Sequence, residues 1–508
     1  MSTRTLFYGF CISVVCLAAY RRVRMRARLP PGPPGRWLIG NLRDIPHDIP
    51  QWLTFKHWGE KFGEIVYLEV FTRRMVILNS YAAVAELLDK RSANYSDRPP
   101  MHMANDLMSW NWDFVHMRYS DRWRLHRKTF HQYFQSRAVP AYLPIQMRAT
   151  RTLLQRLSKD PTHFDSHIRE HSGGVILQVV YGYEIQPEND PYAALAQEAM
   201  ENLNQTVHSG LFLVDFLPIL KYVPAWLPGA GFKRKAKVWA KSSLALRDVP
   251  FESVKASMAT GTATPSFSAD NLAKLNKSAS SPPSLEEVVK NCAGIAYLAG
   301  SDTTIAFLLT WILAMTLNPE AQAKARAEVD AIVGNRLPDF SDRDRSSFPY
   351  VNAMFEETLR WGPVTPLAVP HMNIAEDEYA GYRIPAGTTI VANAFAILHD
   401  ADIFPEPDKF IPERFLPEDG KVPSIRPADV AFGFGRRICP GRYLALNSTW
   451  IVMVSILKTY IIGEALGADG KYITPQVDFS SGTVSHPKPF KCSFTVRSPE
   501  ALALIQSG

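Results

Sequence analysis

Cysteine is scarce in this chain, and the few cysteines are far apart. The 508 residues contain five of them, at Cys11, Cys16, Cys292, Cys439 and Cys492. An odd and widely spaced set provides neither a disulfide framework nor the paired spacing of a zinc site. We therefore expect the folded part of the chain in a reducing compartment.

Net charge is also scarce once the first residues are set aside. The chain carries a formal charge of +7, but residues 1–28 hold six arginines and no acidic residue, so residues 29–508 carry only about +1. We find no nucleic-acid motif and no internal repeat, and a polyanionic partner is not expected. The chain also lacks a flavin or nucleotide motif, so such chemistry has to come from a separate protein.

One uncharged run lies near the N-terminus. Residues 6–20 are mostly apolar and are followed at once by an arginine-rich segment. A membrane span usually needs about 20 residues, although a thin bilayer and snorkelling arginines shorten this requirement. A cleaved signal peptide is the alternative, but charges placed after the run keep the remaining chain cytosolic. We predict a single-pass anchor with a basic stop-transfer segment at residues 1–28, in the endoplasmic reticulum membrane.

Proline and glycine are concentrated directly after this segment, at residues 29–36. Successive prolines fix the backbone and lack N–H donors, which predicts a stiff hinge between anchor and body. The rest of the chain, residues 37–508, is predicted to be one mostly α domain with a smaller β portion. Of the whole chain, 46% is hydrophobic and 11% aromatic, enough for a large core.

Hydrophobic periodicity places several elements in this domain. Residues 65–70 and 74–79 are typical of two strands, and Ser80 is a candidate cap for a helix to Lys90. Helices are also expected at residues 120–134 and 193–207. Residues 210–226 form an apolar flap, either a buried connector or a segment that dips into a membrane interface. Residues 256–283, rich in Ser, Thr and Ala, are expected to be a surface loop.

The segment most suggestive of chemistry is residues 432–441, Phe-Gly-Phe-Gly-Arg-Arg-Ile-Cys-Pro-Gly. A thiolate in a glycine-rich loop, beside backbone amides and an arginine, suits an axial ligand of haem iron. Gly433, Gly435 and Gly441 are expected to let the backbone turn where a side chain would clash. For Cys439 alone, a buried structural cysteine remains the alternative.

This loop resembles the haem-binding loop of the cytochrome P-450 family, whose five pattern positions are filled by Phe432, Gly435, Arg437, Cys439 and Gly441. The resemblance implies haem b held between a long distal helix and this proximal loop. It makes Cys439 the iron ligand, places Arg437 at a haem propionate and places Phe432 near the sulfur.

The distal helix is predicted from Ser284, which starts a capping box, to about Leu317. Its middle reads Ala-Gly-Ser-Asp-Thr-Thr at residues 299–304. A locally satisfied helix kink would explain such residues in most helices. The motif also resembles the family's oxygen-activating groove. By that match Gly300 makes room for dioxygen, Thr303 hydrogen-bonds the oxygen unit, and Asp302 relays protons through water.

Other positions match the family more loosely. Trp123 and Arg127, four residues apart on one helical face, resemble the pair over the haem propionates, and His371 is a further propionate candidate. Glu357, Arg360 and Arg414 resemble a structural triad behind the thiolate loop, although a surface ion pair is the common explanation for such spacing. Candidate substrate contacts are Thr365, Pro366, Leu367, Ala368, Thr483 and Val484, and an ordinary hairpin is the alternative for residues 479–494.

The resemblance, closest to fungal members of secondary metabolism and particularly those of basidiomycetes, implies a membrane-anchored monooxygenase. It would insert one oxygen atom from O2 into a small apolar substrate, such as a terpenoid, with NADPH electrons from a separate membrane-bound reductase. One alternative is a haem-thiolate isomerase or dehydratase that needs no reductase, against which the intact Thr303 counts. A second is a non-catalytic membrane haem-binding scaffold, and a third is a basic membrane-surface adaptor.

Overall fold

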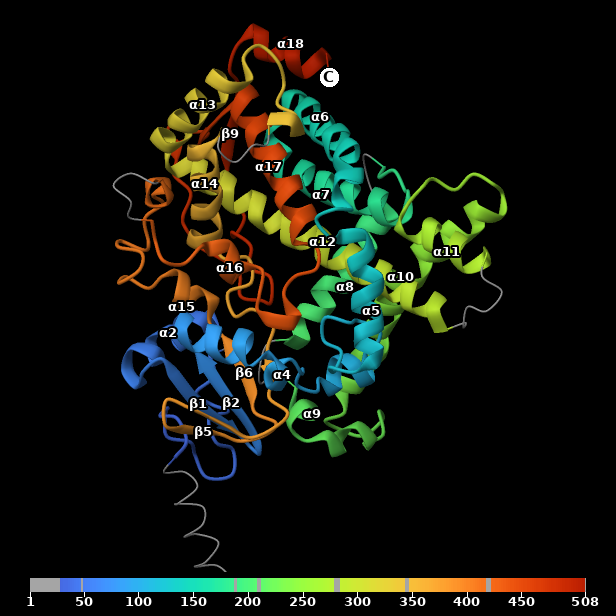
Figure 1. Ribbon diagram of the computed structural model, residues 1–508, viewed down its shortest axis with the longest axis vertical. Coiled ribbons are helices and arrows are strands. Elements are labelled where there is room, and N and C mark those ends of the chain that lie inside the picture. Colours follow the sequence, from blue (N-terminus) through green and yellow to red (C-terminus); the bar gives the residue numbers. More distant parts are fainter. Residues whose placement is uncertain are drawn as a thin grey trace, which may run out of the picture.

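The computed structural model describes residues 28–46, 49–186, 190–207, 212–277, 284–342, 347–416 and 422–507. Figure 1 shows a mostly helical molecule with its largest sheet at one end, which confirms the predicted mostly α class with a smaller β portion. The predicted anchor lies outside the described residues except for Arg28.

The helices, in chain order, are α2 Gln51–Phe62, α3 Tyr81–Val84, α4 Ser92–Tyr95, α5 Asp121–Phe134, α6 Leu143–Lys159, α7 Phe164–Tyr181, α8 Pro191–Val207, α9 Leu213–Phe216, α10 Gly231–Ala259, α11 Phe267–Lys277, α12 Ser284–Leu317, α13 Pro319–Val333, α14 Pro349–Trp361, α15 Ala394–Leu398, α16 Pro427–Ala431, α17 Arg442–Thr459 and α18 Pro499–Ser507. Two π-helical segments, Ala85–Lys90 and His102–Leu107, and several short 3₁₀ turns connect them.

The strands form three small sheets. The largest has the order β1-β2-β6-β3, from β1 Ile65–Val70, β2 Arg73–Leu78, β6 Thr389–Ala392 and β3 His371–Met372. The second pairs β4 Asp377–Tyr379 with β5 Tyr382–Ile384. The third has the order β8-β7-β9, from β8 Tyr472–Ile473, β7 Tyr460–Leu466 and β9 Cys492–Val496. The antiparallel β1–β2 hairpin matches the sequence prediction to within one residue.

Helix α12 is the longest helix among the described residues and runs through the core. It is 34 residues long, packs along α7, and also contacts α5, α10, α11, α14 and α17 (Figure 1). Among the described residues it alone is long and apolar enough to cross a membrane, but 78% of its apolar window is buried inside the protein. A helix that is apolar on all faces is expected in such a core.

Two apolar cores meet along this helix. Residues 288–298 of α12 pack with α5, α8, α10 and α11, whereas residues 305–315 pack with α6, α13, α14 and α17. Residues 299–304 belong to neither core. The polar middle of α12 therefore lies where the two cores separate, and this is where a cavity opens.

Three sequence expectations need correction. Residues 256–283 are not a loop throughout, because α10 extends to Ala259 and α11 buries Phe267 and Leu272. The helix after Ser80 changes to π-helix at Ala85, although Ser80 caps it as predicted by accepting from the N–H of Ala83 at 3.1 Å. The predicted flap is not a buried connector, because its aromatic residues Tyr222 and Trp226 are exposed.

The Pro/Gly hinge is bound to the body. The N–H of Tyr67 on β1 donates to the carbonyl of Pro31 at 2.8 Å. A Cβ on Gly32 would lie 2.1 Å from the carbonyl oxygen of Tyr67, so only glycine allows this approach. The predicted hinge therefore lies along β1, the edge strand of the largest sheet, where the Pro31 carbonyl accepts a backbone hydrogen bond.

Candidate active site

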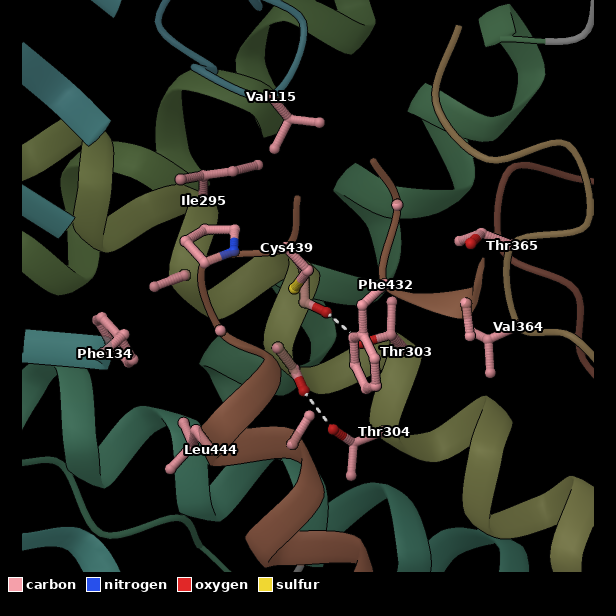
Figure 2. Close-up of a pocket in the computed structure, with 18 of the residues that line it drawn as sticks. Val115, Phe134, Ile295, Thr303, Thr304, Val364, Thr365, Phe432, Cys439 and Leu444 are labelled. Carbon is pink, nitrogen blue, oxygen red and sulfur yellow. Dashed lines mark hydrogen bonds between the residues drawn. The ribbon is translucent and has the colours of Figure 1, made fainter. Parts of the chain in front are cut away.

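A cavity of about 280 Å³ brings the predicted loop and the distal helix together. It lies between α12 and the loop of residues 432–441, with walls from α5, α7, α14 and the start of α17 (Figure 2). Most of its lining is apolar and includes Val115, Phe134, Ile295, Phe307, Val364 and Leu444. The loop and the polar middle of α12 therefore face one shared, mainly apolar space.

Cys439 reaches this cavity from the loop just before α17. Its N–H donates to the carbonyl of Phe432 at 2.8 Å. Burial raises the pKa of the Cys439 thiol, while hydrogen bonds from the N–H groups of Gly441 and Arg442 and the charge of Arg127 act in the opposite direction. A thiol surrounded by such donors is suited to carry negative charge when a metal ion binds it.

The glycines of the loop have different roles. Gly435 has φ +54° and Gly433 φ +74°, conformations that favour glycine. Gly441 has φ −92°, and a Cβ there would have no neighbour within 4 Å. Gly441 thus lines the cavity and directs its N–H at Cys439, with no protein neighbour that requires glycine there, and a clash with a group bound in the cavity stays a prediction.

Three buried or half-buried arginines, Arg98, Arg127 and Arg437, line the same cavity. The Arg437 guanidinium donates to the carbonyl of Ser96 at 2.8 Å, and that of Arg98 to Val369 at 2.7 Å. Burial lowers the pKa of all three and brings that of Arg437 to about 10. None forms an ion pair with a carboxylate among the described residues. Positive charge gathered without a carboxylate partner favours an anionic ligand.

Two predicted residues join this cluster. The ring of Trp123 on α5 lies 4.3 Å from the Arg437 guanidinium, a cation–π contact. His371, on β3, donates its Nδ1–H to the carbonyl of Tyr95 at 2.7 Å. Burial and the neighbouring arginines hold the pKa of His371 well below its usual range, so the ring is neutral. Both side chains line the cavity beside the arginines.

The opposite wall is the middle of α12. Thr303 and Thr304 line the cavity and donate backward to the carbonyls of Ala299 and Gly300, at 2.7 Å and 2.9 Å (Figure 2). A Cβ on Gly300 would lie 3.0 Å from the side chain of Ile176 on α7. Gly300 thus lets α7 pack against α12, and its oxygen-binding role remains a prediction.

Asp302 does not line this cavity. Its Oδ1 lies 3.1 Å from His486 Nε2, in the turn before β9. Neither residue is fully buried, because the side chains are 16% and 19% exposed. The sequence predicted Asp302 as a candidate but contained no sign of its histidine partner.

Glu357, Arg360 and Arg414 come together as predicted. Arg360 Nε and an Nη donate to the two carboxylate oxygens of Glu357 at 2.7 Å and 2.8 Å, and both side chains are fully buried on α14. Arg414 Nε lies 3.5 Å from Glu357 Oε1. The surface ion pair considered from the sequence is therefore excluded, because a fully buried bidentate pair is part of the core.

The predicted substrate contacts divide between two places. Thr365 and Ala368 line the main cavity, whereas Leu367, Ala368 and Thr483 line a smaller one beside α2. Pro366 and Val484 line neither. The carbonyl of Pro366 accepts from the N–H of Phe395 at 3.0 Å, and Val484 is buried.

Three ionisable residues at or beside the site were missed from the sequence: Arg98, His171 and His486. His171 lines the cavity from α7, and both of its ring nitrogens are buried without a hydrogen-bond partner among the described residues. None of these residues lies in a motif, so no local pattern could have revealed them.

The arrangement fits an iron porphyrin. Cys439 supplies one soft ligand, the unpaired arginines suit two propionate groups, and the apolar walls suit the macrocycle. In the described part of the chain no group of three or more His, Cys, Asp and Glu residues is arranged to hold a metal ion.

Comparison with known proteins gives the same result. The family model for cytochrome P-450 matches residues 30–494. The chain is 44% identical over 482 residues to a cytochrome P-450 monooxygenase of Armillaria gallica, covering 94% of this chain and 93% of that protein. It is 42% identical to cytochrome P-450 monooxygenase 208 of Postia placenta, covering 98% and 96%. It is 39% identical to tryptamine 4-monooxygenase of Psilocybe cyanescens, covering 96% of both.

Proposed function

The chain belongs to the cytochrome P-450 family and is a monooxygenase, and from this premise we propose that it oxygenates a small apolar substrate at the endoplasmic reticulum membrane. Electrons come from NADPH through a separate reductase. The substrate is a secondary metabolite, terpenoid or another small apolar molecule.

The observation that carries the substrate class is the cavity lining. Phe114, Val115, Ile295, Ala296 and Val364 bring no charge to the cavity, and the charged residues that line it are the arginine cluster. An apolar wall binds an apolar ligand by removing its surface from water. A charged substrate would find no group of opposite charge beside Thr303, whereas a hydrocarbon or aromatic skeleton would contact the apolar side chains of the wall.

The residues divide the work of oxygenation. When bound, haem would supply the redox chemistry for reduction of O2 and transfer of one oxygen atom. Cys439 would hold the metal, and Arg98, Arg127, Arg437 and His371 would hold the propionate groups. The Thr303 hydroxyl lies at the cavity wall, where it can exchange its bond to the Ala299 carbonyl for one to a group in the cavity, while Asp302, the neighbouring carboxylate, supplies protons behind it.

The exposed apolar surface supports membrane attachment. Trp37 and Trp226 are about four-fifths exposed at 80% and 78%. Phe71 of the β1–β2 turn lies 6.1 Å from Phe216 of α9, ring centre to ring centre, and donates its N–H to the carbonyl of Ile39. These contacts join the loop that carries Trp37 to the flap, which contains α9. The two segments together present apolar side chains suited to a lipid interface.

The test begins with the reduced, carbon-monoxide-bound absorption spectrum of membranes that express the chain. A thiolate-type, red-shifted Soret band is expected, and Cys439→Ala should abolish it. Addition of apolar ligands should then shift the oxidised Soret band, and product should require both NADPH and reductase. A band that survives Cys439→Ala in folded protein would overturn the ligand assignment, and NADPH-independent product would overturn the proposed electron source.

A further inference from the structure

The acidic residue of α12 has a basic partner from a distant part of the chain. His486 Nε2 lies 3.1 Å from Asp302 Oδ1. Asp302 is next to Thr303, which lines the cavity, but Asp302 itself lies outside that lining. The carboxylate therefore faces the turn of residues 480–487 from the flank of the helix, next to the face that lines the cavity.

His486 is held in this place by backbone contacts. Its N–H donates to Ser480 Oγ at 3.0 Å, and its carbonyl accepts from the N–H of Ser480 at 2.8 Å. The N–H of the preceding Ser485 donates to the carbonyl of Val364 at 2.8 Å. The turn is thus tied both to itself and to the segment that lines the cavity, so its histidine is positioned by the fold.

Each member of the pair has a second polar atom that is buried and unpaired. Asp302 Oδ2 and His486 Nδ1 have no hydrogen-bond partner among the described residues, and the same holds for Thr483 Oγ1 in the same turn. Buried polar atoms in proteins are almost always satisfied by protein or by ordered water. A chain of polar atoms therefore runs from Nδ1 through the ring to Nε2, then to Oδ1 and Oδ2.

We propose that His486 is the proton-transfer partner of Asp302. Release of the Nε2 proton to Oδ1 and uptake of another at Nδ1 leave the ring neutral and Asp302 protonated at Oδ1. Rotation of the carboxyl group then turns this proton toward Thr303, and its release restores the carboxylate. The ring then returns to its Nε2–H tautomer by exchange with solvent. This inference rests on the proposed monooxygenase function, because that reaction consumes protons at the cavity beside Thr303. Histidine suits the role because either of its two ring nitrogens can carry the proton.

The test compares His486→Gln with His486→Leu in the full-length holoenzyme. A glutamine amide can donate a hydrogen bond to Asp302 but cannot take up a proton at one atom and release one at another, whereas leucine can do neither. In infrared spectra of the resting enzyme, the carboxylate bands assigned with Asp302→Asn should stay in place in His486→Gln and shift in His486→Leu. Both variants should keep the thiolate-type carbon monoxide spectrum.

In turnover, both variants should lower kcat about tenfold, below the hundredfold or more typical of a direct general acid. KM for the substrate should stay constant, and the solvent deuterium isotope effect on kcat should rise. His163→Gln is the matched control, because His163 forms an exposed pair with Asp160 at 2.6 Å and neither residue lines the cavity.

Wild-type kcat and isotope effect in His486→Gln would overturn the proton-transfer role and leave His486 as a structural latch. Unchanged carboxylate bands in His486→Leu would overturn the contact itself. The infrared comparison needs no turnover, so failure of the proposed oxygenation would be recognised separately, by NADPH-independent product or by none in the wild type.

Discussion

A single backbone angle decides which residue can occupy position 435 of the thiolate loop. Gly435 has φ +54°, and a Cβ there would lie 2.2 Å from the carbonyl oxygen of Leu88. The same glycine donates its N–H to Asp89 Oδ1 at 2.5 Å. The loop that carries Cys439 is thus fastened to the π-helical segment Ala85–Lys90 through a position that tolerates no side chain.

Gly435→Ala should destabilise the holoprotein by about 3 kcal/mol or more, because it combines a strained angle with a backbone clash. Gly231→Ala is the comparison, because its φ is not positive and its Cβ would meet only the end of the Arg234 side chain at 3.7 Å, so it should cost about 1 kcal/mol or less. Thermal unfolding of both variants measures the difference. Equal stability would contradict the structural reason given for Gly435.

At the same scale, Thr303→Ala removes a hydroxyl that contacts the Ala299 carbonyl at 2.7 Å. Alanine is a good helix former, so α12 should stay intact. Product formed per NADPH should fall about a hundredfold and peroxide release should rise, because a positioned proton donor is lost. Thr310→Ala is the control, since Thr310 makes the same backward bond to Ala306 at 2.8 Å but lies outside the cavity lining. Tight coupling in Thr303→Ala would remove the proton-delivery assignment.

At the scale of elements, α14 is joined to the chain that follows it by one buried ion pair. Arg360 donates to the carbonyls of Pro407 and Lys409 at 2.7 Å and 2.9 Å, and Glu357 accepts from the N–H of Ile411 at 2.7 Å. All three guanidinium nitrogens of Arg360 donate hydrogen bonds, and both carboxylate oxygens of Glu357 accept them. These bonds offset the free-energy cost of burying the two charges. The pair supports the segment leading toward the thiolate loop.

Glu357→Gln should destabilise the protein by about 3 to 5 kcal/mol, because Arg360 is left as an uncompensated buried charge. Haem-loaded protein should decrease together with the thermal midpoint. Glu406→Gln, which removes an exposed pair with Lys409, should leave the thermal midpoint nearly unchanged. The contrary result, a Glu357→Gln protein that loads haem at the wild-type level, would exclude structural support as the role of the triad.

At the scale of the whole molecule, the site is the place where two apolar cores separate along α12. Such a cavity brings polar residues of several helices into contact with apolar walls, and His171 on α7 is one of them. Burial lowers the pKa of His171 to about 4. The folded protein therefore keeps this imidazole neutral where the unfolded chain would charge it.

The sign of the pH effect follows from this difference. An unfolded histidine takes up a proton below about pH 6.5, and the folded protein does so only near pH 4. The contribution is fully present above pH 6.5 and is lost as the pH falls toward 4. Wild-type protein should lose about 2 kcal/mol more of unfolding free energy between pH 7 and pH 5 than His171→Leu does. Urea unfolding at the two pH values measures this, and equal losses would contradict a neutral buried His171.

The sequence by itself determined the features that depend on neighbouring residues. Local periodicity and capping predict the bounds of α12 and α5, the β1–β2 hairpin and the Ser80 cap. The loop of residues 432–441 indicates a thiolate ligand through its own cysteine, glycines and arginines. Glu357 and Arg360 are three residues apart on one helix, so their contact was also predictable, although their complete burial was not.

The tertiary structure alone decided what depends on residues far apart in the chain. His486 meets Asp302 across more than 180 positions, and Arg98 joins Arg437 across more than 330. Packing also divided the predicted substrate residues between two cavities. It placed the Ile176 side chain where a Cβ on Gly300 would lie 3.0 Å away. Such contacts leave no local pattern, because they form only when separate helices and turns bury their apolar faces against one another.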